Sequence, residues 1–113
     1  MRMKTEVFYS AAARRDLEDI GRYIAEELES PKTAERTVER LLDAADGLEE
    51  WPERGALLFR MAGVSSPYRF LVSGSYLIVY RAEERRVVIV RILYGRRDYA
   101  RLFPFLTGPA QGE

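Results

Sequence analysis

The chain has 113 residues, and its composition already excludes several classes of protein. This length allows one domain with a core of modest size. Apolar residues make up 47% and charged residues 32%, which is typical of a globular protein. No apolar run reaches the roughly 18 residues that a membrane helix needs, and no secretion signal is visible, so we expect a cytoplasmic protein away from the membrane.

Two residue types are missing from the chain, which contains neither cysteine nor histidine. The absence of cysteine removes disulfides, thiol catalysis and cysteine zinc sites. The absence of histidine removes the commonest general base and the commonest metal ligand. Any catalysis would therefore have to rest on Arg, Lys, Tyr, Asp or Glu.

Charge is divided unevenly between the two halves of the chain. Residues 1–58 contain 9 basic and 14 acidic residues, whereas residues 59–113 contain 9 basic and 4 acidic residues. All nine basic residues of the second half are arginines, which suit interfaces and phosphates better than lysines do. Either the two halves attract each other, or a basic sheet meets an acidic protein or a nucleic acid. The large apolar residues between the arginines favour an acidic protein partner.

The first half of the chain predicts a strand followed by two helices. The strand covers 4–9, and Ser10 is placed as the N-cap of a helix that runs to about Leu28. Its apolar residues recur at spacings of three and four. They are Ala13, Leu17, Ile20, Ile24 and Leu28. Ser30-Pro31 starts a second helix, and the short break predicts an antiparallel hairpin. Trp51 ends this helix, and we expect it to cap the core between helices and sheet.

The second half predicts an antiparallel meander. An irregular segment over 53–67, with a short extra piece around 57–61, leads into strands over 68–72, 75–82 and 87–94. Ser73-Gly74 is the first turn and a charged turn the second. A helical turn over 98–103 completes a single domain, residues 1–103, before a flexible tail, 104–113. The predicted class is α+β: an N-terminal strand, an antiparallel helical hairpin, a three-stranded antiparallel meander forming one sheet, and a short C-terminal helical turn.

Both faces of the predicted sheet are apolar. One face holds Tyr76, Ile78 and Tyr80 and the other Leu77 and Val79; in the last strand Val88, Val90 and Ile92 alternate with Val87, Ile89 and Leu93. An antiparallel sheet with one wet face would show polar residues at alternate positions. One face must therefore cover the helices, and the other either encloses a small second core or awaits a partner.

Three motifs, in this order, resemble the RelE/ParE superfamily of bacterial toxins. They are Ser10-Ala11-Ala12-Ala13-x-x-Asp16-Leu17-x-x-Ile20-x-x-Tyr23-Ile24, Gly74-x-Tyr76-Leu77-Ile78-x-Tyr80 and Arg91-Ile92-Leu93-Tyr94-Gly95-Arg96-Arg97-Asp98. The likeness covers about residues 4–103. One departure is visible, because the position before Gly95 is often histidine in the family and is Tyr94 here.

The resemblance implies a toxin of a type II toxin–antitoxin pair, held in a hetero-oligomer by a cognate antitoxin. RelE-like members cut messenger RNA on the ribosome, whereas ParE-like members inhibit DNA gyrase. The basic positions of the RelE-like set fall at Tyr68, Phe70 and Leu77, which are uncharged. We therefore expect a ParE-like, non-enzymatic toxin with no catalytic residue and no sequence-specific DNA binding of its own. This interpretation also implies no metal and no cofactor. A RelE-like endoribonuclease using Tyr94, Arg96 and Arg97, or a non-toxic plasmid-stabilisation protein, remains the alternative.

Two groups of site residues follow from this interpretation. The residues expected to bind the antitoxin are Arg69, Leu77, Val79, Arg81 and Arg91. The residues expected to bind the target are Tyr94, Arg96, Arg97 and Asp98. The alternative for the arginines is internal pairing with helix carboxylates such as Glu18 or Asp19. The alternative for Asp98 is a cap on the last helical turn.

Overall fold

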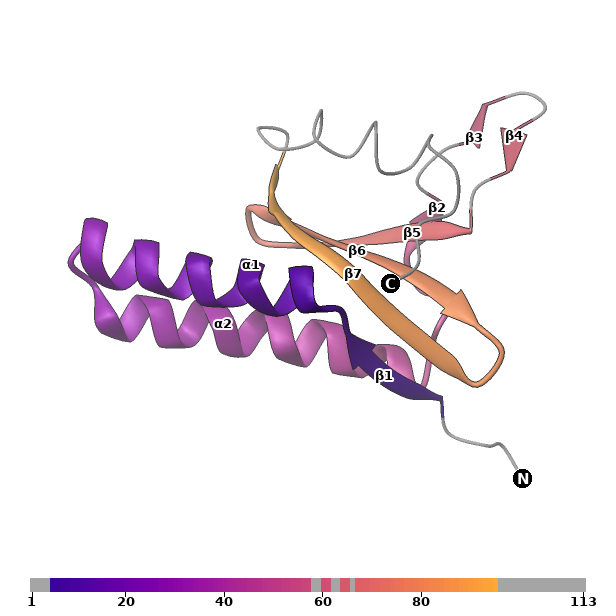
Figure 1. The fold of residues 1–113 in the computed structure, drawn as a ribbon, viewed down its shortest axis with the longest axis horizontal. Helices are drawn as coiled ribbons and strands as arrows, with labels where there is room; N and C mark the ends of the chain where they lie inside the picture. Colours follow the sequence, from indigo (N-terminus) through magenta and orange to yellow (C-terminus); the bar gives the residue numbers. More distant parts are fainter. Residues whose placement is uncertain (1–4, 58–59, 62–63, 66, 96–113) are drawn as a thin grey trace.

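A computed structural model describes residues 5–57, 60–61, 64–65 and 67–95, and it places two helices against one face of a five-stranded sheet (Figure 1). The main elements in chain order are β1 (Glu6–Tyr9), α1 (Ala11–Arg22), α2 (Pro31–Asp46), β2 (Ala56–Leu57), β5 (Tyr68–Ser73), β6 (Tyr76–Glu83) and β7 (Arg86–Tyr94). The α+β class is confirmed. Among the described residues, no helix has both the length and the apolar character needed to cross a membrane.

The helical hairpin begins where the sequence predicts. Ser10 caps α1, since its hydroxyl oxygen accepts a hydrogen bond from the Ala13 N–H at 3.0 Å. The helix ends in a π-helical turn, η1 (Tyr23–Glu27), and α2 then starts with Pro31 at its first turn. A 3-10 turn, η2 (Gly47–Glu49), closes α2.

Trp51 does not cap the core, contrary to the expectation from the sequence. Its side chain is 66% exposed. The fully buried Leu48, which lies in η2, packs into the core at this end of the hairpin instead. Since the chain leaves the helix through this turn, Trp51 emerges into solvent.

The strand order of the sheet is β1-β7-β6-β5-β2. The meander β5-β6-β7 is antiparallel, whereas β1 lies parallel to β7, with Glu6 opposite Arg86 and Tyr9 opposite Ile89. The two-residue strand β2 pairs antiparallel with β5. Strands β3 (Arg60–Met61) and β4 (Val64–Ser65) pair with each other as a separate two-stranded sheet. The extra piece expected around 57–61 is thus divided between β2 and β3.

The alternation predicted for the last strand is wrong after Val90, because β7 contains a bulge. Tyr80 of β6 lies opposite Ile89 and Val79 lies opposite Arg91, so Val90 is the extra residue. An extra residue shifts the pattern of side chains by one position. As a result Ile92, not Leu93, joins Val87 and Ile89 on the face that carries the helices.

Both faces of the sheet carry a cluster of buried apolar residues. The helix-side cluster contains Ala13, Leu41, Ala45, Leu48, Ile78, Tyr80, Val87, Ile89 and Ile92. The second cluster contains Tyr68, Val79, Val88, Val90 and Leu93, with Phe70 packed against it. Of the two possibilities raised by the sequence, the second face thus forms a small second core in this chain.

Candidate interaction surface

Arg91 of β7 forms a bidentate ion pair with Asp16 of α1. Nε of Arg91 donates to Oδ2 of Asp16 at 2.8 Å, and Nη2 donates to Oδ1 at 3.0 Å. The backbone N–H of Ile92 donates to the same carboxylate at 2.8 Å. The side chains of Arg91 and Asp16 are only 28% and 13% exposed, so little of the pair is open to solvent. Such bidentate, charge-assisted contacts are among the stronger hydrogen bonds in proteins.

The position of this pair follows from the local architecture of β7. Strand β1 stops pairing at Ile89, and the Ser10 hydroxyl donates to the carbonyl oxygen of Val90 at 2.9 Å. Beyond that point α1 takes the place of β1 beside β7, and Asp16 accepts the edge N–H of Ile92. Asp16 therefore finishes the edge of the sheet after β1 ends.

The sequence placed Asp16 in a family motif without giving it a role. A signal was present, because Asp16 lies three residues after Ala13 and one before Leu17, on the apolar side of the helix. The internal partner of Arg91 is thus a helix carboxylate, as the alternative interpretation held, but it is Asp16 and not Glu18 or Asp19.

Arg81 belongs to a second ion-pair group, at the β6–β7 turn. Its Nε donates to Oε2 of Glu83 at 2.6 Å, and Nε of Arg86 donates to Oε1 at 2.6 Å. The hydrogen bond from Arg86 has the largest effect and lowers the pKa of Glu83; burial opposes it, and the hydrogen bond from Arg81 lowers the pKa further. The carboxylate of Glu83 is therefore shared between two strand arginines.

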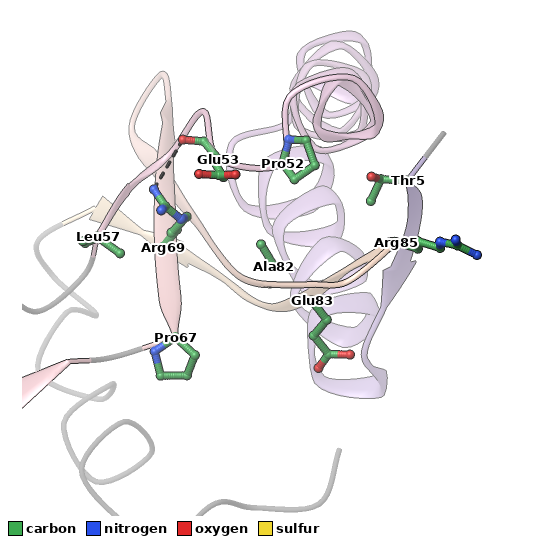
Figure 2. Close-up of a pocket in the computed structure, with 9 residues that line it drawn as sticks. All are labelled: Thr5, Pro52, Glu53, Leu57, Pro67, Arg69, Ala82, Glu83 and Arg85. Atoms are coloured by element: carbon green, nitrogen blue, oxygen red, sulfur yellow. Dashed lines mark hydrogen bonds between the residues drawn. The ribbon is translucent and has the colours of Figure 1, made fainter. Parts of the chain in front are cut away.

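Arg69 of β5 is bound to the backbone of the loop that follows η2 (Figure 2). Its Nη1 donates to the carbonyl oxygen of Gly55 at 2.8 Å and to that of Glu53 at 3.3 Å. Its cross-strand neighbour Tyr80 holds the same loop, since the Tyr80 hydroxyl donates to the Pro52 carbonyl at 2.8 Å and accepts the Gly55 N–H at 2.8 Å. Arg69 and Tyr80 together fix this loop over the helix side of the sheet.

Replacing Tyr80 by phenylalanine tests how far this loop depends on the hydroxyl. The ring keeps its packing, but the Gly55 N–H and the Pro52 carbonyl both lose a partner. We expect the free energy of unfolding to fall by about 1–3 kcal/mol, measured by urea denaturation. The matched control is Tyr23→Phe, because Tyr23 is 55% exposed and its substitution should change stability by less than about 0.5 kcal/mol. Equal losses for the two variants would contradict the role given to the Tyr80 hydroxyl.

The two apolar residues expected to bind the antitoxin occupy different environments. Val79 is fully buried in the second core. Leu77 is half-buried and lies opposite Val72, which is 66% exposed at the end of β5. Leu77 is thus closer to the open surface than Val79 is, and the interface role of both residues stays a prediction.

Tyr94 lies at the end of β7 and is 47% exposed. Its ring meets that of Tyr76 edge to face, with centroids 5.5 Å apart. Burial raises the pKa of Tyr76, and the neighbouring hydroxyls of Tyr94 and Tyr23 raise it further. Arg96, Arg97 and Asp98, the other residues expected to bind the target, and the helical turn expected over 98–103 lie outside the described residues.

Chains of two solved toxin–antitoxin systems share this fold. A chain of the chromosomal ParDE system from P. aeruginosa superposes with a TM-score of 0.67 at 20% identity, covering 81% of this chain and 97% of that one. A chain of the RelBE2 toxin–antitoxin complex from Mycobacterium tuberculosis superposes with a TM-score of 0.61 at 23% identity, covering 83% and 94%. The chain thus shares its fold with chains of these two toxin–antitoxin systems.

Sequence comparison identifies the family. The family model described as "ParE toxin of type II toxin-antitoxin system, parDE" matches residues 7–99. Toxin RelE2 of Caulobacter vibrioides is 36% identical over 92 residues, which cover 81% of this chain and 97% of that protein. The chain belongs to the ParE toxin family of type II toxin–antitoxin systems, and the superfamily predicted from its motifs is confirmed.

Proposed function

We propose that this protein is a ParE-like toxin without nuclease activity, which a cognate antitoxin neutralises and which acts on DNA gyrase. The observation that carries the proposal is the engagement of the strand arginines. Arg81 and Arg86 share the Glu83 carboxylate, and Arg91 pairs with Asp16, in the part of the chain that the structure describes. Arg91 in particular is matched by both oxygens of Asp16.

RNA cleavage by attack of a 2′-hydroxyl needs a proton acceptor and positive charge at the phosphate. The sequence contains no histidine, and its last lysine is Lys32. With Arg91 paired to Asp16, few groups on the described sheet are available for that chemistry. This shortage supports a toxin that acts by binding.

The family also supports a protein partner. The neighbouring structures are described as a ParDE system and a RelBE2 toxin–antitoxin complex. By analogy, we propose that this chain forms a hetero-oligomer with an antitoxin and needs no cofactor.

The RelE-like alternative rests on a specific finding, namely that the 36% identical relative carries the name Toxin RelE2. In that case Tyr94, Arg96 and Arg97 would serve the cleavage reaction, and Arg96→Ala would abolish it.

Inducible expression in bacteria separates these functions. Plasmid supercoiling, chromosome breaks and transcript integrity are measured in the same culture, with and without co-expression of the small protein encoded beside this chain. We expect growth arrest, altered supercoiling or breaks, intact transcripts, and rescue by the co-expressed protein. Codon-positioned transcript cleavage with normal DNA would establish the ribonuclease instead. Normal growth both with and without the co-expressed protein would indicate the non-toxic partner-binding protein.

A further inference from the structure

A cavity of about 440 Å³ lies beside Arg69, between the loop after η2 and the ends of β5 and β6 (Figure 2). Pro52, Leu57 and Pro67 give it apolar walls, and the small side chain of Ala82 lies on the sheet between Arg69 and the β6–β7 turn. A site of this size accommodates one or two side chains of a bound segment.

Arg69 enters this cavity with its position already fixed. Both of its hydrogen bonds within the described residues come from one nitrogen, Nη1, which holds the carbonyl oxygens of Glu53 and Gly55. Nε and Nη2 form no hydrogen bond with any of the described residues, although the side chain is half-buried. A guanidinium has five donors, and the Nε–Nη2 edge matches the two oxygens of a carboxylate.

The rigidity of Arg69 matters for affinity. A free arginine loses side-chain entropy when it binds, but this one is already held by the loop that Tyr80 also fixes. The remaining edge of the guanidinium is thus held in position before any ligand binds.

The lining favours a single carboxylate over a nucleic-acid strand. The charged residues that line the cavity are two arginines, Arg69 and Arg85, and two glutamates, Glu53 and Glu83, and the glutamates would repel successive phosphates of a polyanion. Glu83 is largely neutralised by Arg81 and Arg86, so one negative group beside Arg69 meets little opposition. Pro52, Leu57 and Pro67 in turn suit apolar residues next to that group.

We propose that this cavity receives an acidic side chain of the antitoxin, flanked by apolar residues, and that its carboxylate pairs with Nε and Nη2 of Arg69. The proposal rests on the proposed function, since it requires that the chain has an antitoxin.

The test measures binding of the small protein encoded beside this chain to the full-length toxin, by calorimetry. Two variants address the cavity. Arg69→Lys keeps the positive charge but removes the Nε and Nη2 donors that would bind both oxygens of a carboxylate. Ala82→Leu fills the cavity while leaving Arg69 in place. We expect each to weaken binding roughly 10- to 100-fold. The matched control is Arg36→Lys on the exposed surface of α2, which should change the Kd less than about threefold. Denaturation midpoints confirm that every variant folds.

A second measurement identifies the group that is bound. Each Asp or Glu of the partner is changed to Asn or Gln and combined with Arg69→Lys. One acidic residue should weaken binding to the original toxin but not weaken it further in the Arg69→Lys variant.

The outcomes separate the two proposals. If the partner binds and neutralises the toxin, but Arg69→Lys and Ala82→Leu bind as tightly as the original chain, the cavity is not the docking site and the proposed function stands. If the partner neither binds nor neutralises, both proposals fail. If a 12-nucleotide single-stranded RNA binds the original chain and Ala82→Leu abolishes that binding, the cavity holds a phosphate and the acidic side chain is excluded.

Discussion

Asp16→Asn is expected to lower the free energy of unfolding by about 2–3 kcal/mol. The change removes the negative charge that pairs with Arg91 and replaces one of the two acceptor oxygens by an NH2 group, which cannot accept a hydrogen bond, so at least one of the three bonds to this carboxylate is lost. The pair is only partly buried, so the expected loss lies below that of a fully buried ion pair. In a thermal scan the loss corresponds to a Tm lower by roughly 6–12 °C.

The same helix offers a matched control. Asp19 pairs with Arg22 at 3.4 Å, but these side chains are 70% and 60% exposed. Exposed pairs contribute little, so Asp19→Asn should change stability by less than about 0.5 kcal/mol. A double-mutant cycle of Asp16→Asn with Arg91→Met isolates the coupling between the two groups. Additive losses in that cycle would show that Asp16 acts only through the Ile92 N–H.

Gly55→Ala is the second variant for which we expect a large effect, again about 2–4 kcal/mol of lost stability. A Cβ at Gly55 would lie 2.6 Å from the carbonyl oxygen of Phe70 and 2.7 Å from the ring and hydroxyl of Tyr80. The backbone of β5 cannot move aside without disturbing its pairing with β2 and β6. The loop must therefore lift, which breaks the Tyr80 and Arg69 hydrogen bonds together.

Gly21→Ala provides a control of opposite sign. Gly21 lies in α1, and a Cβ there would meet only Cγ2 of Val38, at 3.4 Å. Alanine in a helix stabilises by roughly 0.5–1 kcal/mol relative to glycine, so this variant should be as stable as the original chain or more so. Unfolding midpoints in urea measure both variants. If Gly55→Ala unfolds at the same urea concentration as the original chain, the close approach of the loop to β5 is not a requirement of the fold.

Local sequence signals predicted the elements well because local interactions determine them. Ser10 caps α1 through a bond to a residue three positions away, and Pro31 starts α2 with its own backbone geometry. The sequence predicted the meander equally well, although several strands extend one residue further than expected. The first turn is therefore formed by Gly74 and Ser75. Gly74 has a φ of 59°, which explains a glycine there.

The errors arose where distant residues decide the outcome. The faces of β7 after Val90 depend on a bulge, which coincides with the end of β1 pairing. The partner of Arg91 lies 75 residues earlier; helical spacing places Asp16 on the apolar side of α1, but it does not say which strand residue the carboxylate meets. Likewise, Arg69 donates to two backbone carbonyl oxygens of a loop. Every residue has such a carbonyl, so the residue types in the loop do not predict this contact.

The parallel pairing of β1 with β7 has a consequence for how the chain acquires its structure. Glu6 lies opposite Arg86, so the first strand finds its neighbour only after most of the chain exists. The Tyr9–Asp46 hydrogen bond attaches β1 to α2, but among the described strands β1 pairs only with β7. Contacts of such high sequence separation delay folding, because a long loop must close first. On the ribosome, a nascent chain that stops before β7 therefore has neither its complete sheet nor the Asp16–Arg91 pair.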